Sequence, residues 1–233
     1  MSSEMFVDPI VRFLAIPAGA YVIGSTPFAV MISKLRGVDL RKAGSGNVGA
    51  TNVARAVGFK FGVFCFVLDV MKGLLPTLAA GNLLGVIGSG IPAPVVQAAW
   101  LAAGCGCIIG HVFSFYLRGR GGKGVATSLG VVLGVYPYMT FPAIAAFLVW
   151  GVVTFLSRYV SLGSIVASVL FLPIFVAINA MRDGFSGALR LWPMGCFILV
   201  MVVLIVYKHR VNIRKLLDGQ EYRMGGGGSN GQW

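Results

Sequence analysis

Long apolar runs separated by short polar stretches dominate the chain. Runs of about 20 largely apolar residues predict membrane-spanning helices, and they lie at 13–33, 59–80, 94–117, 160–180 and 189–207. A longer run, 124–156, contains the turn-like sequence Tyr136-Pro137-Tyr138. Because proline interrupts a helix, we divide this run into helices 124–136 and 138–156. The pattern predicts an all-α polytopic membrane protein with seven spanning helices, and six is the competing number.

Composition agrees with a membrane protein. Hydrophobic residues make up 57% of the 233 residues, charged residues 11%, and the mean hydropathy is +0.86. An ordinary soluble domain has about 25% charged residues, so soluble, disordered, collagen-like and coiled-coil proteins are excluded. Four cysteines lie in apolar runs at 65, 105, 107 and 196, with spacing that does not suit a metal site. They are expected to be small buried hydrophobes.

The distribution of basic residues predicts the orientation. With seven helices, 14 of the 19 Lys and Arg lie on one side of the membrane, in loops 34–58, 118–123 and 157–159 and in the C-terminal tail. The other side has Arg12, Arg182 and Arg190, and the remaining two, Lys60 and Lys72, lie on the second predicted helix. Positive charge favours the cytoplasmic side, which places the N-terminus outside and the C-terminus in the cytoplasm. We expect one transmembrane domain, 1–223, followed by a flexible glycine-rich tail, 224–233.

A glycine-rich cluster at 44–52 on the basic side is the first candidate site. Alternating glycines let the backbone turn tightly and direct N–H groups inward. Short polar side chains and a following arginine complete a set of donors suited to phosphate. The candidates are Ser45, Gly46, Asn47, Gly49, Thr51, Asn52 and Arg55. The alternative is a plain connector between helices.

Three further clusters lie on the same side. In 118–124 three cations, including Lys123, alternate with glycines such as Gly121 and Gly122, and the helix expected from 124 would add its dipole. An anchor that only follows the positive-inside rule is the alternative. Ser161 and Ser164 form a weaker cluster, since small residues commonly pack membrane helices.

The C-terminal tail supplies the last pair of candidates. His209 and Asn212 are three residues apart and would share a face if the last helix continued. Inside the second predicted helix, Asp69 and Lys72 favour a structural ion pair over a catalytic one, and His111 is interpreted as structural. The chain has no paired carboxylates, metal cluster or dinucleotide fingerprint, so we expect no cofactor and no metal.

In order and spacing, these motifs resemble the bacterial acyl-phosphate:glycerol-3-phosphate acyltransferases, the PlsY family. The matching segments cover roughly 20–221: Gly24-Ser25-Thr26-Pro27-Phe28, the run 44–55, Asp69-x-x-Lys72-Gly73, Gly110-His111, the run 118–127, 161–164 and His209-x-x-Asn212-Ile213. The resemblance implies a multi-pass enzyme of phospholipid synthesis in the bacterial cytoplasmic (inner) membrane, with its active site facing the cytoplasm. It would move a fatty acyl group from acyl-phosphate to the 1-hydroxyl of glycerol 3-phosphate, giving lysophosphatidate and phosphate.

The resemblance also implies roles for the matching residues of this chain. Ser45, Asn47 and Thr51 would grip the acyl-phosphate head with help from Ser161 or Ser164, and Arg55 and Lys123 would bind the phosphate of glycerol 3-phosphate. His209 and Asn212 would approach the acceptor hydroxyl, whose proton passes either to His209 or to a substrate phosphate.

Partners also follow from the resemblance. They are the two substrates, the lipid bilayer and the peripheral enzyme that makes acyl-phosphate, with no nucleic acid. The alternative function is an organic-phosphate transporter, whose cations would lie on broken helices near the bilayer midplane.

Overall fold

The computed structural model describes residues 7–224, and helices joined by loops account for its regular structure. No strand occurs among the described residues, which confirms the all-α prediction. The elements are, in chain order, the π-helix Val11–Ala15, α1 (Ile16–Gly24), α2 (Phe28–Leu35), α3 (Ala50–Ala56), α4 (Phe59–Leu83), α5 (Pro94–Val112), the 3-10 helix Phe115–Leu117, α6 (Val125–Gly134), α7 (Thr140–Ser157), α8 (Val160–Arg190), α9 (Trp192–Lys208) and α10 (Arg210–Leu217).

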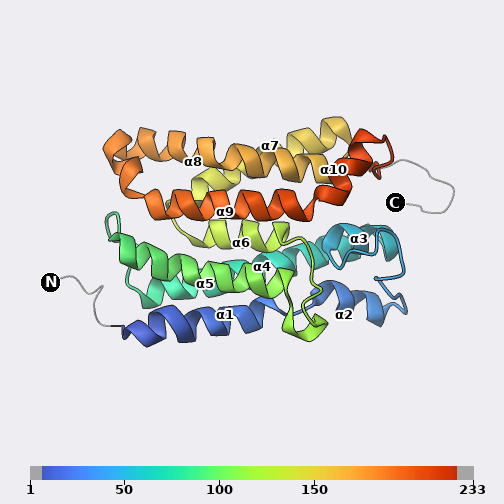
Figure 1. The fold of residues 1–233 in the computed structure, drawn as a ribbon, viewed down its shortest axis with the longest axis horizontal. Coiled ribbons are helices and arrows are strands. Elements are labelled where there is room, and N and C mark those ends of the chain that lie inside the picture. Colours follow the sequence, from blue (N-terminus) through green and yellow to red (C-terminus); the bar gives the residue numbers. More distant parts are fainter. Residues whose placement is uncertain (1–6, 225–233) are drawn as a thin grey trace.

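The long helices run side by side in a bundle (Figure 1). Its main packing pairs are α4 with α6, α1 with α5, and α7 with α8. Small residues allow these close approaches: a Cβ at Gly130 of α6 would lie 2.0 Å from the carbonyl oxygen of Val70 on α4. Glycine is common at helix contacts in membranes. The hydrophobic effect does not drive helices together there, so association depends on close packing of their backbones.

The break at Pro137 is confirmed, but α6 is shorter than predicted. It has ten residues, or about 15 Å of helix, which is half of the hydrocarbon core. By length and composition, five helical segments of the described chain can cross a membrane, and six can if the bent pair α9–α10 is one span. Among residues 7–224, fewer than seven helices are therefore long enough to cross a membrane by themselves, because α6 has only ten residues.

Other predicted boundaries also move. The segment predicted as 13–33 is interrupted between α1 and α2, where Pro27 cannot continue the hydrogen-bonded ladder. The segment 94–117 leaves α-helix after Val112, and the loop 34–58 contains the unpredicted short helix α3. The last helix does not continue straight through the tail, since α9 and α10 meet at His209 with a bend of 56°.

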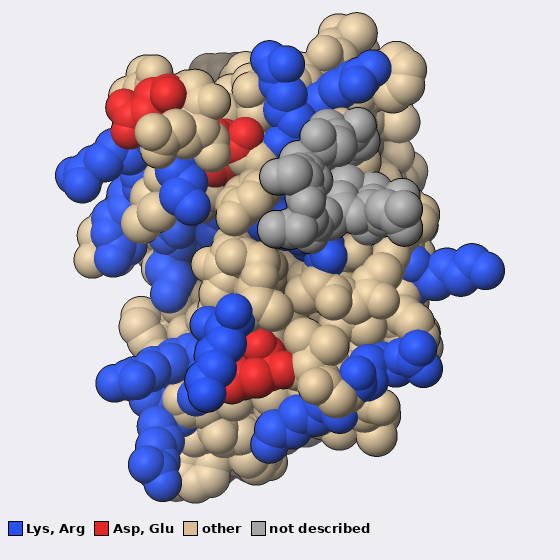
Figure 2. All heavy atoms as spheres, turned by 90° about the vertical axis from the view of Figure 1, so that its right-hand side faces the viewer, with Lys and Arg blue, Asp and Glu red and all other residues tan. Residues whose placement is uncertain are grey.

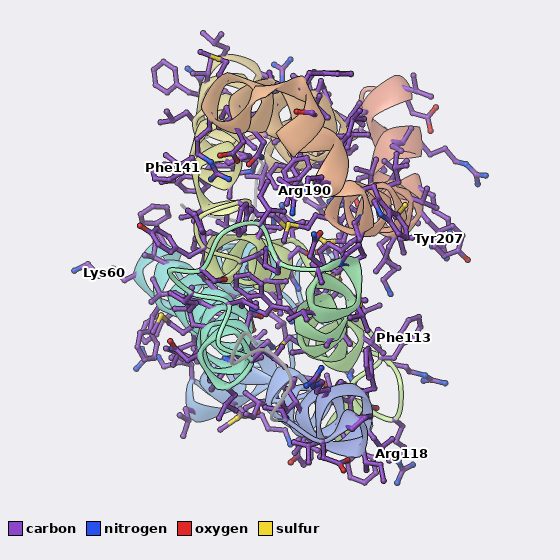
Figure 3. The ribbon with its side chains drawn as sticks, turned by 90° about the vertical axis from the view of Figure 1, so that its left-hand side faces the viewer. Lys60, Phe113, Arg118, Phe141, Arg190 and Tyr207 are labelled. Carbon is purple, nitrogen blue, oxygen red and sulfur yellow. The ribbon has the colours of Figure 1, made fainter. Side chains whose placement is uncertain are left out.

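Apolar side chains cover much of the outside of the bundle. Phe113, Phe141 and Tyr207 point away from it in Figure 3, and their exposed fractions are 51%, 48% and 60%. Such an apolar exterior would promote association in water, whereas in a bilayer it contacts lipid tails.

The loops that carry the sequence motifs gather at one end of the bundle. The connections around α3, between α5 and α6 and between α7 and α8, together with α10, lie at the right-hand end in Figure 1. Figure 2 views this end directly, and Lys and Arg side chains are spread over it. The fold thus brings segments distant in sequence to a single basic face.

Candidate active site

A cavity of about 220 Å³ opens beneath this basic face. It is lined by residues from all four motif clusters. Of the candidates named from the sequence, Ser45, Asn47, Gly49, Thr51, Asn52, Arg55, Lys123, Ser161, Ser164, His209 and Asn212 line it. Gly46, Gly121 and Gly122 do not. The structure therefore brings most of the predicted site residues together.

The glycine-rich loop is shaped by Asn52, which is 1% exposed. Its side-chain amide donates to the carbonyl oxygens of Leu40 (3.2 Å) and Ala43 (3.0 Å), and its Oδ1 accepts from the backbone N–H of Ser45 (2.9 Å). Gly44 has φ +58°, and a Cβ there would lie 2.3 Å from Asn52 Oδ1. Asn52 thus holds the loop, while Ser45, Asn47 and Thr51 are left to line the cavity.

Gly121 and Gly122 bring Lys123 to the cavity by packing against the end of α5. Their backbone N–H groups donate to the carbonyl oxygens of Val112 (3.1 Å) and His111 (3.2 Å). A Cβ at Gly121 would lie 1.9 Å from the His111 oxygen, and one at Gly122 would lie 2.4 Å from its Nε2. The close approach to α5 by itself requires glycine at both positions.

Four side chains form a hydrogen-bonded chain across the cavity. Lys123 Nζ donates to Asn212 Oδ1, and Asn212 Nδ2 donates to Glu221 Oε1 (2.7 Å). Ser161 Oγ donates to the same carboxylate oxygen (2.9 Å). This chain links α10, the segment before α6, the start of α8 and the tail after α10.

The two cations of the cavity are partly withdrawn from water. Burial lowers the pKa of Lys123 to about 8, although the Glu221 carboxylate opposes the shift. Burial also lowers the pKa of Arg55, against the influence of Tyr222 and Glu221. The Arg55 guanidinium lies 3.8 Å from the centre of the Tyr222 ring. Poorly solvated cations of this kind attract an anion more strongly than surface cations do.

His209, which follows the end of α9, is 2% exposed. Its Nδ1 lies 2.8 Å from the carbonyl oxygen of Ile205, so this nitrogen carries a proton and Nε2 is the basic one in the neutral ring. Burial and the nearby Lys123 ammonium lower the pKa of His209 to about 4. The imidazole is therefore neutral and weakly basic near pH 7.

The predicted pair on α4 is present and is joined by a histidine. Lys72 Nζ lies 2.7 Å from Asp69 Oδ1, and both side chains are at most 4% exposed. Lys72 also donates to the carbonyl oxygen of Thr26 (2.9 Å), and His111 Nδ1 lies 3.7 Å from Asp69 Oδ1. Asp69 and His111 both line the cavity. The group ties α4 to α5 and to the break between α1 and α2.

The inner part of the cavity is apolar. Its wall comes from α4, α6, α7, α8 and α9 and consists mainly of Phe66, Leu129, Val132, Ala143, Ala146, Phe147, Trp150, Phe171, Ile198, Met201, Val202 and Ile205. Phe147 and Trp150 stack with ring centres 5.2 Å apart, and Phe66 stacks on both. The cavity thus joins a cationic, hydrogen-bonding end to an aliphatic and aromatic end, as an amphiphilic ligand requires.

Several cavity residues were not named as site residues from the sequence. Glu221, Tyr222 and Lys215 come from the tail, which has little pattern of its own, and Ser128 lies on α6. Glu221 is one of only seven acidic residues in the chain, and it lies in a tail that is otherwise rich in basic residues. This contrast in the sequence could have marked it as a candidate site residue. Met224, assigned to the glycine-rich tail, also lines the cavity, while residues 225–233 of that tail lie outside the described residues.

Comparison with known proteins gives consistent matches. The family model described as glycerol-3-phosphate acyltransferase matches residues 14–219. Glycerol-3-phosphate acyltransferases from Aquifex aeolicus and Geobacter sulfurreducens are 44% and 42% identical over 207 and 210 residues. These alignments cover 88% and 90% of this chain and 95% and 96% of the relatives.

Two solved structures share the fold. Both are crystal structures of PlsY, an integral membrane glycerol 3-phosphate acyltransferase, in its glycerol 3-phosphate form and its lysophosphatidic acid form. Their TM-scores are 0.74 and 0.73 at 40% and 39% identity, and each match covers 91% of this chain and 95% of that one.

Proposed function

Because the chain belongs to the glycerol-3-phosphate acyltransferase family, we propose that it transfers a fatty acyl group from acyl-phosphate to the 1-hydroxyl of glycerol 3-phosphate. The products are lysophosphatidate and inorganic phosphate. The resemblance drawn from the sequence motifs is confirmed by the family model and by the relatives. A transporter of organic phosphates is not favoured, because the cations come from loops at one end of the bundle.

The observation that carries this proposal is the division of one cavity into two chemical parts. Arg55 and Lys123 offer positive charge at one end, and an aromatic and aliphatic wall continues from it into the bundle. An acyl-phosphate has the same division, with an anionic head on an apolar chain. Glycerol 3-phosphate has only the anionic part and can approach from the basic face.

The positions of the cavity residues support the roles proposed from the family resemblance. The loop bearing Ser45, Asn47 and Thr51 would hold the acyl-phosphate head together with Ser161 or Ser164, which lie at the start of α8. Asn52 would act indirectly, since its amide is engaged by the loop backbone.

The acceptor has its own set of residues. Arg55 and Lys123 would bind the phosphate of glycerol 3-phosphate, with His209 and Asn212 beside its hydroxyl.

The reaction needs positioning and charge stabilisation more than a strong base. An acyl-phosphate is a mixed anhydride: the hydroxyl oxygen forms a bond to the acyl carbon, the bond from that carbon to the phosphate oxygen breaks, and phosphate leaves. Preorganised cations and amides stabilise the charge that develops. The weakly basic His209 supports a phosphate oxygen as acceptor of the hydroxyl proton, with His209 as a neutral neighbour.

Phosphate release by the purified protein tests the proposed reaction. Acyl-phosphate should be converted to phosphate only when glycerol 3-phosphate is present, with one lysophosphatidate formed for each phosphate released. Hydrolysis of acyl-phosphate that ignores glycerol 3-phosphate, or no turnover in lipid, would contradict the assignment.

We further propose that the basic face lies in the cytoplasm at the bacterial inner membrane, where the peripheral enzyme that makes acyl-phosphate can reach it. The asymmetry of positive charge supports this orientation.

A cysteine replacing Lys42, which is exposed in the loop before α3, should react with an impermeant reagent only in opened cells. A cysteine at Gly90, exposed between α4 and α5, should react in intact cells, in a Cys196→Ser background for both. The reverse pattern would overturn the orientation.

A further inference from the structure

The tail after α10 enters the candidate acceptor site. Gly219, with φ +67°, ends α10, and the following N–H of Gln220 donates to the carbonyl oxygen of Lys215 (2.7 Å). This is a common way to end a helix. The chain then crosses to the turn between α7 and α8, where Met224 N–H donates to the carbonyl oxygen of Arg158 (2.8 Å) and Arg223 Nε donates to Tyr159 Oη (2.9 Å). We call the segment 220–224 the strap.

The strap engages the residues assigned to substrate. The Glu221 carboxylate accepts hydrogen bonds from Ser161 and Asn212, and it contributes to the electrostatic surroundings of both Lys123 and Arg55. Tyr222 covers the face of the Arg55 guanidinium. One carboxylate oxygen of Glu221 and the ring of Tyr222 thus contact side chains that the proposed function assigns to the two substrates, namely Ser161, Asn212 and Arg55.

The Glu221 carboxylate is buried in the site in the way that a bound anion would be. Its Oε2 is fully buried and has no hydrogen-bond partner among residues 7–224, whereas Oε1 accepts two hydrogen bonds. A carboxylate is tolerated out of water when cations compensate it, and here the compensating cations are those of the site. The family model match ends at residue 219, two residues before Glu221.

We propose that the strap is an intramolecular competitor of glycerol 3-phosphate. In the free protein, Glu221 and Tyr222 occupy the acceptor-phosphate site, and they must leave before glycerol 3-phosphate binds. This inference rests on the proposed function of the site. The apparent affinity for a ligand equals its intrinsic affinity multiplied by the fraction of the protein whose site is open. Weakening the strap should therefore tighten acceptor binding, whereas a catalytic role for Glu221 predicts a loss of turnover.

Steady-state kinetics of Glu221→Gln separate these two roles. At pH 6.5, where Lys123 stays protonated, the KM for glycerol 3-phosphate should fall on the order of tenfold, and kcat should not fall. Tyr222→Ala, which removes the ring stacked on the Arg55 guanidinium, should change KM in the same direction. Asp218→Asn is the matched control, since it makes the same charge change three residues earlier at an exposed position outside the cavity, and its KM should match wild type.

Binding of inorganic phosphate provides a readout that does not depend on acyl transfer. Calorimetric titration without acyl-phosphate should show tighter binding to Glu221→Gln and Tyr222→Ala than to wild type or Asp218→Asn. If the proposed reaction failed, this result could still be obtained. A raised KM, a reduced kcat in Glu221→Gln, or unchanged phosphate affinity in both strap variants would overturn the proposal.

Discussion

Replacing Lys123 with alanine should lower kcat/KM for glycerol 3-phosphate by about 10- to 150-fold. A hydrogen bond to a charged group contributes about 1.5–3 kcal/mol, and each 1.4 kcal/mol corresponds to about a tenfold change. Most of the loss should occur in the acceptor KM, because the ammonium would hold the acceptor phosphate before and during transfer. Initial rates over a range of glycerol 3-phosphate, at saturating acyl-phosphate, measure the effect.

The pH dependence of the same step gives Lys123 a distinct signature. Its pKa is lowered to about 8, so the ammonium loses its proton, and its attraction for phosphate, as the pH rises through that value. The profile of kcat/KM reports groups of the free enzyme and should fall on the alkaline side of about pH 8. Lys123→Arg keeps its charge across this range, so its remaining activity should lack this alkaline fall.

Lys60→Ala is the matched control for Lys123→Ala. Lys60 is exposed at the start of α4 and projects away from the bundle in Figure 3. Removing it changes the net charge equally but removes no cavity residue, so kcat/KM should stay within about twofold of wild type, as is usual for exposed charges. A normal acceptor KM in Lys123→Ala would remove this residue from the phosphate site.

Much of the site was predictable because its chemistry is local in the sequence. The glycine-rich run before Arg55 and the run before Lys123 each concentrate donors and flexible backbone within about ten residues. Alternating apolar spans then place such loops on the same side of a membrane. These two features explain why the loops that carry the motifs lie together at the end of the bundle where the cavity opens.

The tail and the glycine roles were less predictable, because both depend on tertiary contacts. The 56° bend at His209 returns α10 and the strap over the cavity, and no residue in the tail signals that bend. Gly121 and Gly122 resemble phosphate-binding glycines, yet they serve the close approach to His111. The shortness of α6 was hidden because its apolar sequence continues through the break that follows it.

The buried pair on α4 leads to the largest expected change in stability. Asp69→Asn keeps the size of the side chain but leaves the Lys72 ammonium, whose side chain is 4% exposed, without its carboxylate. Breaking a buried pair in this way costs about 3–5 kcal/mol, and within a bilayer few alternative partners exist for the remaining charge. Thermal unfolding of the purified protein in detergent should show a clearly lower midpoint.

Asp183→Asn is the control for this change. Asp183 pairs with Arg182 at 2.6 Å, but both side chains are about 30% exposed. A pair this accessible contributes about 0–1 kcal/mol, so the midpoint should change little. The same chemical substitution at the two positions isolates the effect of burial.

The double variant Asp69→Asn with Lys72→Met identifies the cause of the loss. Removing both charges leaves no uncompensated ion, so the double variant should be less destabilised than the sum of the two single variants. Variants that still fold should keep a normal acceptor KM, because the pair holds α4 against Thr26 and His111 while Arg55 and Lys123 bind phosphate. An Asp69→Asn protein with the wild-type midpoint and no turnover would instead assign Asp69 to the chemistry.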